Sequence, residues 1–178
     1  MSTTSARTKK NNIVLIGMPG AGKSTIGVLL AKRLSKRFVD TDLVIQHRQK
    51  MPLQEVLDRF GYLHLREVEE QAICSLRVRN TVIATGGSAV YSVKAMEHLQ
   101  TYGTIIYLKL SVTGVRARIT DFSTRGIAKP PEQTFSALFR ERTRLYRHYA
   151  DAMVTCTAKS HEEVLAGVLR ICAGPGVH

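Results

Sequence analysis

The stretch NIVLIGMPGAGKSTIGVLLAK, residues 12–32, decides the fold of this chain. Its apolar start, residues 13–16, predicts a short buried strand, and the apolar residues at helical spacing over 26–34 predict a helix. Residues 17–24 lie between them and read G-x-x-x-x-G-K-S, the phosphate-binding P-loop pattern in the strand-to-helix context that it requires. We therefore predict a nucleotide site at this turn.

Each residue type in this turn suits a bound polyphosphate. Glycines let successive N–H groups point inward, and the first turn of the helix adds unpaired N–H groups and the positive end of its dipole. Lys23 is expected to reach the β- and γ-phosphates of a nucleotide, and the Ser24 hydroxyl to bind Mg²⁺. The predicted nucleotide-binding residues of the loop are Gly20, Ala21, Gly22, Lys23, Ser24 and Thr25. The alternative is a plain glycine turn with a solvated lysine.

Composition restricts the class of protein. The 178 residues are 44% hydrophobic, which fits one globular domain with a basic tail over 1–11 and a second tail over 173–178. The three cysteines are scattered and lack C-x-x-C spacing, which argues against a disulfide framework or a zinc site and favours a reducing, cytoplasmic setting. The sequence has no apolar run long enough for a membrane span and no signal-peptide pattern, so no membrane partner is expected.

The net charge of +12 raises the question of nucleic acid as a partner. The cations are not massed in one arm, aromatic residues are not interleaved with them, and tryptophan is absent, which disfavours nucleic acid as the main ligand. A pocket that handles a polyanionic nucleotide and an acidic substrate also needs cations. We expect a monomer that acts on a small molecule.

Strand and helix patterns alternate five times, which predicts an α/β fold with a five-stranded parallel sheet and helices on both faces. The continuous apolar run over 104–108 is typical of a strand that is covered on both sides. Pro52 is expected to open a helix that Gly61 ends, and Arg66 to start the next one. The predicted strands cover 13–16, 38–39, 82–85, 104–108 and 153–156.

Charged residues follow the second predicted strand. Asp40 and Asp42 come at its carboxyl end, and on an extended chain they point in opposite directions, so one can order the water around Mg²⁺ while the other meets an acceptor hydroxyl. The alternative is a turn in which Asp42 caps the next helix. Arg66 near a helix start opposes the dipole preference, which indicates an anion; its alternative is a solvated pair with Glu69 or Glu70.

Three further features indicate a ligand site. Gly86 and Gly87 directly follow a buried strand, so a ligand can approach the backbone there, although a plain turn is the alternative. Arg142 falls on or beside the apolar face of a predicted helix over 135–150, which is unusual for a merely solvated residue. Residues 120–134 are polar, contain several helix breakers and lack periodicity, which predicts a mobile lid.

Taken together, the motifs GMPGAGKST, FVDTD, LREVEE, ATGGS, STRG and ERTRLYRHYAD resemble the shikimate kinases, in the family's order and over about 12–171. The resemblance implies the three-layer fold of the nucleoside-monophosphate kinases, with a substrate-binding helical region over about 42–76 and a lid over about 120–134. It also implies transfer of the γ-phosphoryl group of ATP to the 3-hydroxyl of shikimate with Mg²⁺, a step in aromatic amino acid biosynthesis.

The same resemblance implies roles on the phosphate side of the site. Lys23 and the lid arginine Arg125 match catalytic residues that contact the transferring phosphate. Ser24 and Asp40 match residues that hold Mg²⁺ and its waters. Arg118 matches an arginine that lies against adenine.

On the acceptor side, Asp42 matches the catalytic acid that receives the substrate hydroxyls. Arg66 and Arg142 match the pair that grips the substrate carboxylate, for which the guanidinium fork is suited. Gly86 and Gly87 match the glycine loop beside the substrate.

Two departures from the family pattern bear on the substrate. The third glycine of the glycine loop is Ser88, and the usual R-P-L-L of the lid begins here with Arg125 and Gly126, which is expected to loosen it. Two alternatives therefore stay open. One is a kinase of the same fold for another hydroxy acid such as gluconate, and the other is a nucleotide-binding regulator without turnover.

Overall fold

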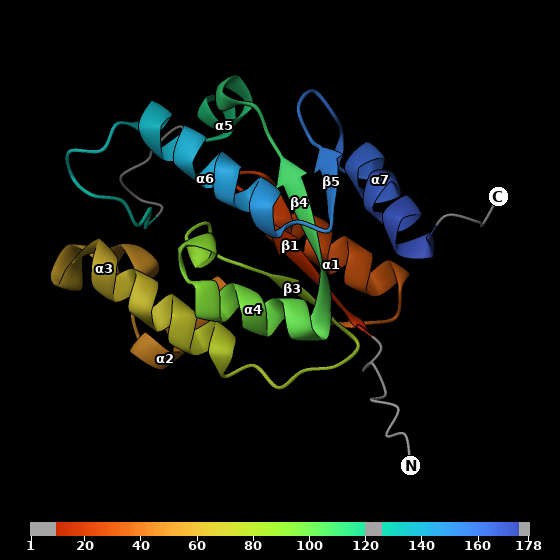
Figure 1. The fold of residues 1–178 in the computed structure, drawn as a ribbon, viewed down its shortest axis with the longest axis horizontal. Coiled ribbons are helices and arrows are strands. Elements are labelled where there is room, and N and C mark those ends of the chain that lie inside the picture. Colours follow the sequence, from red (N-terminus) through yellow and green to blue (C-terminus); the bar gives the residue numbers. More distant parts are fainter. Residues whose placement is uncertain (1–9, 120–125, 175–178) are drawn as a thin grey trace, which may run out of the picture.

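The computed structural model describes residues 10–119 and 126–174, which form a five-stranded sheet flanked by helices (Figure 1). The strand order is β2-β3-β1-β4-β5, and every neighbouring pair is parallel, so the predicted fold class is confirmed. The strands are β1 (Asn12–Ile16), β2 (Arg37–Asp40), β3 (Thr81–Ala84), β4 (Gly103–Lys109) and β5 (Ala152–Thr155).

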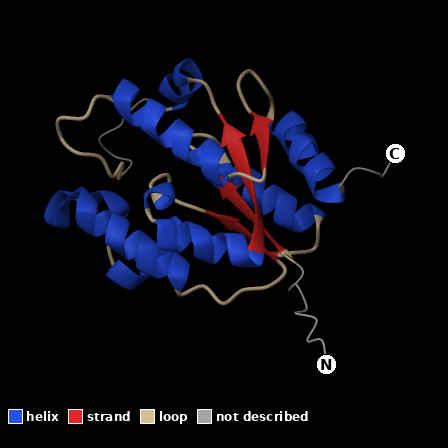
Figure 2. Ribbon diagram, in the orientation of Figure 1, coloured by secondary structure: helices blue, strands red, loops and turns tan. Residues whose placement is uncertain are grey.

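Helices cover both faces of this sheet (Figure 2). In Figure 1, α4 and α6 lie in front of the strands and α1 lies behind them, where α7 packs against α1. The helices are α1 (Lys23–Arg33), α2 (Thr41–Gln49), α3 (Leu53–Cys74), the 3-10 turn η1 (Ala89–Tyr91), α4 (Val93–Tyr102), α5 (Val112–Arg118), α6 (Phe135–Tyr149) and α7 (His161–Ala173). No helix in the described ranges is long and apolar enough to span a bilayer.

Two hydrophobic clusters hold the fold. The larger one surrounds β1, whose five residues are all buried, and it includes Val82 and Ile83 of β3 and the residues 105–108 of β4. The smaller one joins α2 and α3 to the segment that follows residue 125, through Ile45, Val56, Leu65, Val68, Ala72 and Ala128. The α2–α3 region thus has a hydrophobic centre of its own beside the sheet.

The helix α3 is interrupted at Gly61, which has φ +81° and ψ 172°. A Cβ at this position would meet nothing within 4 Å, so the backbone conformation and not packing favours glycine. The prediction that Gly61 ends one helical segment is confirmed. The next segment resumes directly after it, however, so the prediction that Arg66 starts that segment is wrong.

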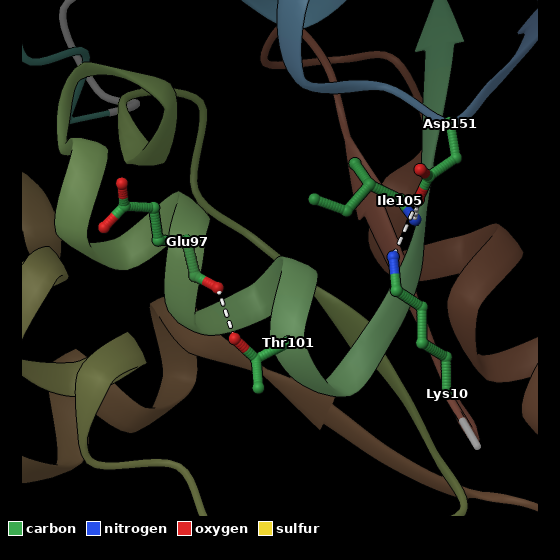
Figure 3. A network of polar contacts seen from close by, with 5 residues as sticks. All are labelled: Lys10, Glu97, Thr101, Ile105 and Asp151. Atoms are coloured by element: carbon green, nitrogen blue, oxygen red, sulfur yellow. Dashed lines mark hydrogen bonds and ion pairs between the residues drawn. The ribbon is translucent and has the colours of Figure 1, made fainter. Parts of the chain in front are cut away.

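The amino-terminal edge of the sheet is fixed by Asp151 (Figure 3). Its Oδ2 accepts from the N–H of Ile105 at 2.8 Å and lies 3.9 Å from the Nζ of Lys10. On α4, the hydroxyl of Thr101 donates to the carbonyl of Glu97 at 2.9 Å. The contacts of Asp151 lie at the amino-terminal ends of the strands, and an α/β sheet binds its ligands at the opposite, carboxyl ends.

Candidate active site

The P-loop has the geometry that its sequence predicts. It leaves β1, and α1 begins at Lys23 with Gly22 as the N-cap residue. Gly20 and Gly22 have φ +78° and +91°, which L-residues with side chains rarely adopt. A Cβ on Gly17 would stand 2.6 Å from the carbonyl oxygen of Leu108, so the chain passes too close to β4 for any other residue.

Lys23 lies buried within this loop. Its Nζ donates to the carbonyls of Gly17 at 2.9 Å and Met18 at 3.0 Å. Burial lowers the pKa of Lys23 to about 8, and the nearby carboxyl groups of Asp42 and Asp40 oppose that shift. The ammonium group is therefore a weakly solvated cation beside two acids, the setting in which a phosphate gains most from it.

The two predicted acids have different positions. The side chain of Asp40 ends β2 and accepts from the Ser24 hydroxyl at 2.6 Å and from the N–H of Asp42 at 3.0 Å. Asp40 is thus the N-cap of α2, so the turn and the cap that the alternative expected are present, but the residue that caps is Asp40 and not Asp42. Asp42 stands in the first turn, and burial, followed by the charge of Asp40, raises the pKa of its carboxyl to about 6.

One cavity of about 780 Å³ joins the P-loop to a second group of polar side chains. On the nucleotide side it is lined by Gly20, Gly22, Lys23, Ser24, Thr25 and Arg118. On the other side it is lined by Asp42, Glu69, Gly86, Gly87, Ser88 and Arg142. Most of the predicted site residues are therefore brought together, although Ala21, Asp40 and Arg66 are not among those that line the cavity.

Arg142 and Arg66 meet at the edge of this cavity. Their Nη2 atoms donate to the same carbonyl, that of Ala128, at 2.8 and 3.3 Å. Arg142 is only 1% exposed, and the Arg66 guanidinium lies 3.6 Å from the centre of the Tyr91 ring. Each Nε is buried without a hydrogen-bond partner within the described ranges. The pair thus keeps unused donors for an anion.

The glycine pair after β3 lets the acidic and basic groups pack closely. A Cβ on Gly86 would stand within 2.6 Å of Asp42 Oδ1, and one on Gly87 would stand 2.9 Å from an Nη of Arg142. The N–H of Gly86 donates to the Thr41 hydroxyl at 3.0 Å, and Tyr146 donates to the carbonyl of Gly87 at 2.6 Å. The groups that approach these two glycines are thus side chains of the site itself, and the predicted approach of a ligand stays a prediction.

On the acceptor side of the cavity, Glu69 is a residue that sequence reasoning did not assign to the site. It is 3% exposed, and its Oε2 accepts from the Ser88 hydroxyl, so it is not the solvated partner of Arg66 that the alternative assumed. Burial, followed by the charge of Asp42, raises the pKa of Glu69 to about 7. The spacing of three residues between Arg66 and Glu69 could have indicated that Glu69 belongs to the site, because residues three apart on a helix share a face.

We expect Glu69→Gln to stabilise the protein at alkaline pH. The folded chain holds the Glu69 proton more tightly than the unfolded chain, so stability falls as the pH rises from 4.5 to about 7. Gln keeps the shape and can still accept from Ser88. Urea unfolding should show a gain on the order of 2 kcal/mol at about pH 8.5 and little change at about pH 4.5. The exposed Glu67→Gln on the same helix should show neither effect, and an equal change at both pH values would contradict the argument.

The segment from residue 126 onward packs on α3 and presents the carbonyl of Ala128 to the two arginines. The N–H of Gly126 donates to Gln54 Oε1 at 2.7 Å, and a Cβ on Gly126 would stand 2.8 Å from the Cβ of Leu53. Its φ of +56° is one that proline cannot adopt, so Gly126 permits close packing on α3 in addition to any loosening of the lid. The predicted lid residue Arg125 and the rest of 120–125 lie outside the described residues.

Arg118 lies between the P-loop and β5. Its guanidinium donates to the carbonyl of Gly20 at 3.3 Å and to that of Cys156 at 3.4 Å. Lys159, Ser160 and His161 line the same end of the cavity and were not predicted. They come from the end of the loop after β5 and from the first residue of α7, where the sequence carries no pattern typical of a nucleotide site.

The P-loop lies at the carboxyl ends of the strands of a parallel sheet, at the point where the strand order reverses. It opens on a cavity that acidic and arginine side chains line. These features define the chain as a P-loop kinase. A family model described as shikimate kinase matches residues 19–173, and the chain belongs to that family.

Individual relatives agree with this family. A shikimate kinase from Geobacter sulfurreducens is 35% identical over 160 residues, which cover 88% of this chain and 88% of that protein. The structure of shikimate kinase from Acinetobacter baumannii in complex with shikimate has a TM-score of 0.86 at 26% identity and covers 97% of this chain and 98% of that one. Shikimate kinase from Aquifex aeolicus has a TM-score of 0.80 at 30% identity, with 92% and 96% covered.

Proposed function

We propose that this protein transfers the γ-phosphoryl group of ATP to the 3-hydroxyl of shikimate and so produces shikimate 3-phosphate. The observation that carries the proposal is the single cavity in which Asp42 and Arg142 face Lys23 of the P-loop. Membership of the shikimate kinase family supports the same substrates, and so does the shikimate bound to the Acinetobacter baumannii relative. Retention of both arginines favours an acceptor with a carboxylate.

On the nucleotide side, we assign the phosphates to Lys23 and to the amides of the P-loop and first helical turn. Ser24 and Asp40 would hold Mg²⁺: they are adjacent oxygen ligands, and Mg²⁺ commonly takes only one or two protein ligands beside waters and phosphates. When bound, Mg²⁺ neutralises charge on the β- and γ-phosphates.

On the acceptor side, Arg66 and Arg142 would bind the carboxylate of shikimate with their unused donors. Asp42 would accept the proton of the 3-hydroxyl while that oxygen attacks the γ-phosphorus and the bond to the β-phosphate breaks. The recessed positions of Lys23 and Asp42 shift the pKa values of both groups, and displacement of water from the cavity by the substrates would strengthen the charge interactions there.

Two assigned roles rest on the family resemblance. Arg125 would neutralise charge on the transferring phosphate when the lid closes, and Arg118 would lie against adenine. The position of Arg118 supports its role, since Arg118 contacts Gly20 of the P-loop and lines the same cavity as Lys23.

We expect Asp40→Asn to raise the Mg²⁺ concentration needed for half-maximal activity several-fold. The substitution keeps the cap and the Ser24 contact but removes a negative charge that orders the waters of the metal. The measurement is a Mg²⁺ titration of turnover at saturating ATP and shikimate. The exposed Asp58→Asn on α3 is the control, and an unchanged Mg²⁺ requirement in Asp40→Asn would argue against a metal at this position.

The experiment that tests the function is ADP release measured with ATP alone, with ATP and shikimate, and with ATP and gluconate. Stimulation by shikimate supports the proposal. Stimulation only by gluconate would support a kinase for another hydroxy acid, and ATP binding without any stimulation would support a regulator. Detection of shikimate 3-phosphate by mass spectrometry identifies the product.

A further inference from the structure

Ser88 and Glu69 form a buried pair in the acceptor half of the cavity, and no step described above uses them. Ser88 directly precedes η1 and is 8% exposed, and Glu69 on α3 is 3% exposed. The Ser88 hydroxyl donates to Glu69 Oε2. Ser88 has φ −99°, so its side chain is accommodated without backbone strain. The residue in place of the family's third glycine therefore has a specific partner.

The other oxygen of this carboxyl group is unused. Glu69 Oε1 is buried and has no hydrogen-bond partner within the described ranges. It lies beside Asp42, because Glu69 Oε1 and Asp42 Oδ1 are both within 2.6 Å of the point where a Cβ on Gly86 would stand. Glu69 lines the cavity. A buried acceptor that faces a cavity indicates a hydrogen-bond donor on the ligand.

The groups around Glu69 explain why its orientation needs a fixed partner. Lys23 on α1, Asp42 on α2, and Arg142 and Tyr146 on α6 face it from the elements packed against it. Arg142 and Lys23 attract the carboxylate and Asp42 repels it. A glutamate without an anchor can turn toward either cation and take its free oxygen out of the cavity. The Ser88 hydroxyl is the contact that holds Oε2.

We propose that Ser88 is a positioning residue that holds Glu69 with Oε1 beside Asp42, so that two carboxyl groups receive hydroxyls on adjacent carbons of the acceptor. This inference rests on the proposed function and narrows the acceptor class. It predicts an acid whose carboxylate binds the arginines and whose neighbouring hydroxyls bind Asp42 and Glu69. The role of Ser88 lies in substrate affinity, because Ser88 contacts Glu69 and not the reacting atoms.

The test compares Ser88→Ala with wild type in the ATP and shikimate assay. The KM for shikimate should rise about tenfold, because a tenfold change corresponds to the loss of one well-placed hydrogen bond. The kcat and the KM for ATP should change less than about twofold. Ser88→Thr keeps the hydroxyl and should restore the KM. The matched control is Ser92→Ala, since Ser92 donates to Glu70 Oε2 at 2.6 Å in a similar pair that does not line the cavity. Its loss should lower the melting temperature and leave the KM unchanged.

The pH dependence of the KM for shikimate distinguishes a positioning role of Ser88 from a merely structural one, which would leave this dependence unchanged. The KM for shikimate should rise as the pH falls and Glu69 takes up a proton, because the proton occupies an accepting oxygen. In Ser88→Ala the midpoint of this rise should lie at higher pH, because a donor that favours the carboxylate is lost. In Glu69→Gln the part of the rise with its midpoint near pH 7 should be lost, and the part that remains should follow the protonation of Asp42 near pH 6. Adding Ser88→Ala to Glu69→Gln should neither change the KM further nor shift the remaining midpoint.

Three results would overturn the inference. One is an unchanged KM in Ser88→Ala. Another is a loss of kcat and ATP affinity together with a lower melting temperature, which would mark a structural residue. The third is a full additional effect of Ser88→Ala in the Glu69→Gln background. Absence of shikimate turnover in wild type would overturn the proposed function and this inference with it, whereas wild-type turnover with any of these three results overturns the inference alone.

Discussion

Asp42→Asn is expected to lower kcat at least a hundredfold while ATP still binds. Asp42 lines the cavity opposite Lys23, and the amide keeps its shape but cannot accept the proton of the attacking hydroxyl. Proton transfer by a positioned base contributes about 10² to 10⁴ in rate. The measurements are steady-state kcat with shikimate and the affinity for ATP by calorimetry.

The control for this variant is Asp58→Asn, which removes an exposed carboxylate of α3 that contacts Gln54. It should retain wild-type kcat. If Asp42→Asn kept kcat within about threefold of wild type, positioning by the arginines and charge neutralisation at the phosphate would have to supply the catalysis without a base. Loss of ATP binding in Asp42→Asn would instead place this residue in the nucleotide site.

The parts of the site that were predicted from sequence are those whose conformation depends on residues close together in the chain. The P-loop needs glycines at set positions between a strand and a helix, and the φ values of Gly20 and Gly22 agree. The parallel sheet follows from alternating strand and helix patterns, whose connections bring all strand carboxyl ends to one edge. Asp40 and Asp42 were placed correctly at that edge, but which of them caps α2 depends on one hydrogen bond that two neighbouring acids can each make.

The parts that were missed depend on contacts between distant residues. Ser88 and Glu69 are 19 positions apart, and Arg66 donates to a carbonyl 62 positions away. Helical spacing puts Glu69 on the same face as Arg66, but only the packing of η1 against α3 shows that this face is buried. In the same way, Gly126 was read as a source of looseness, and its positive φ and contact with Leu53 appear only in three dimensions.

Arg142→Lys is expected to raise the KM for shikimate about a hundredfold and to lower kcat much less. Arg142 is 1% exposed, donates one Nη to Ala128 and keeps Nε free, so its fork can hold a carboxylate while the carbonyl contact fixes its plane. A lysine has one point charge and no fork, and burial lowers its pKa. The loss of one or two charge-assisted hydrogen bonds corresponds to a hundredfold effect.

The exposed Arg140→Lys on the same helix is the matched control, and its KM should equal that of wild type. A second arm uses shikimate methyl ester, which lacks the negative charge. If Arg142 binds the carboxylate together with Arg66, wild type should bind the ester at least as weakly as Arg142→Lys binds shikimate, and the variant should prefer the acid over the ester by a much smaller ratio than wild type does. A variant that still prefers the acid by the wild-type ratio would assign the carboxylate to Arg66 alone. Arg142, buried between Tyr91 and Gly87, would then only support that guanidinium and the carbonyl of Ala128.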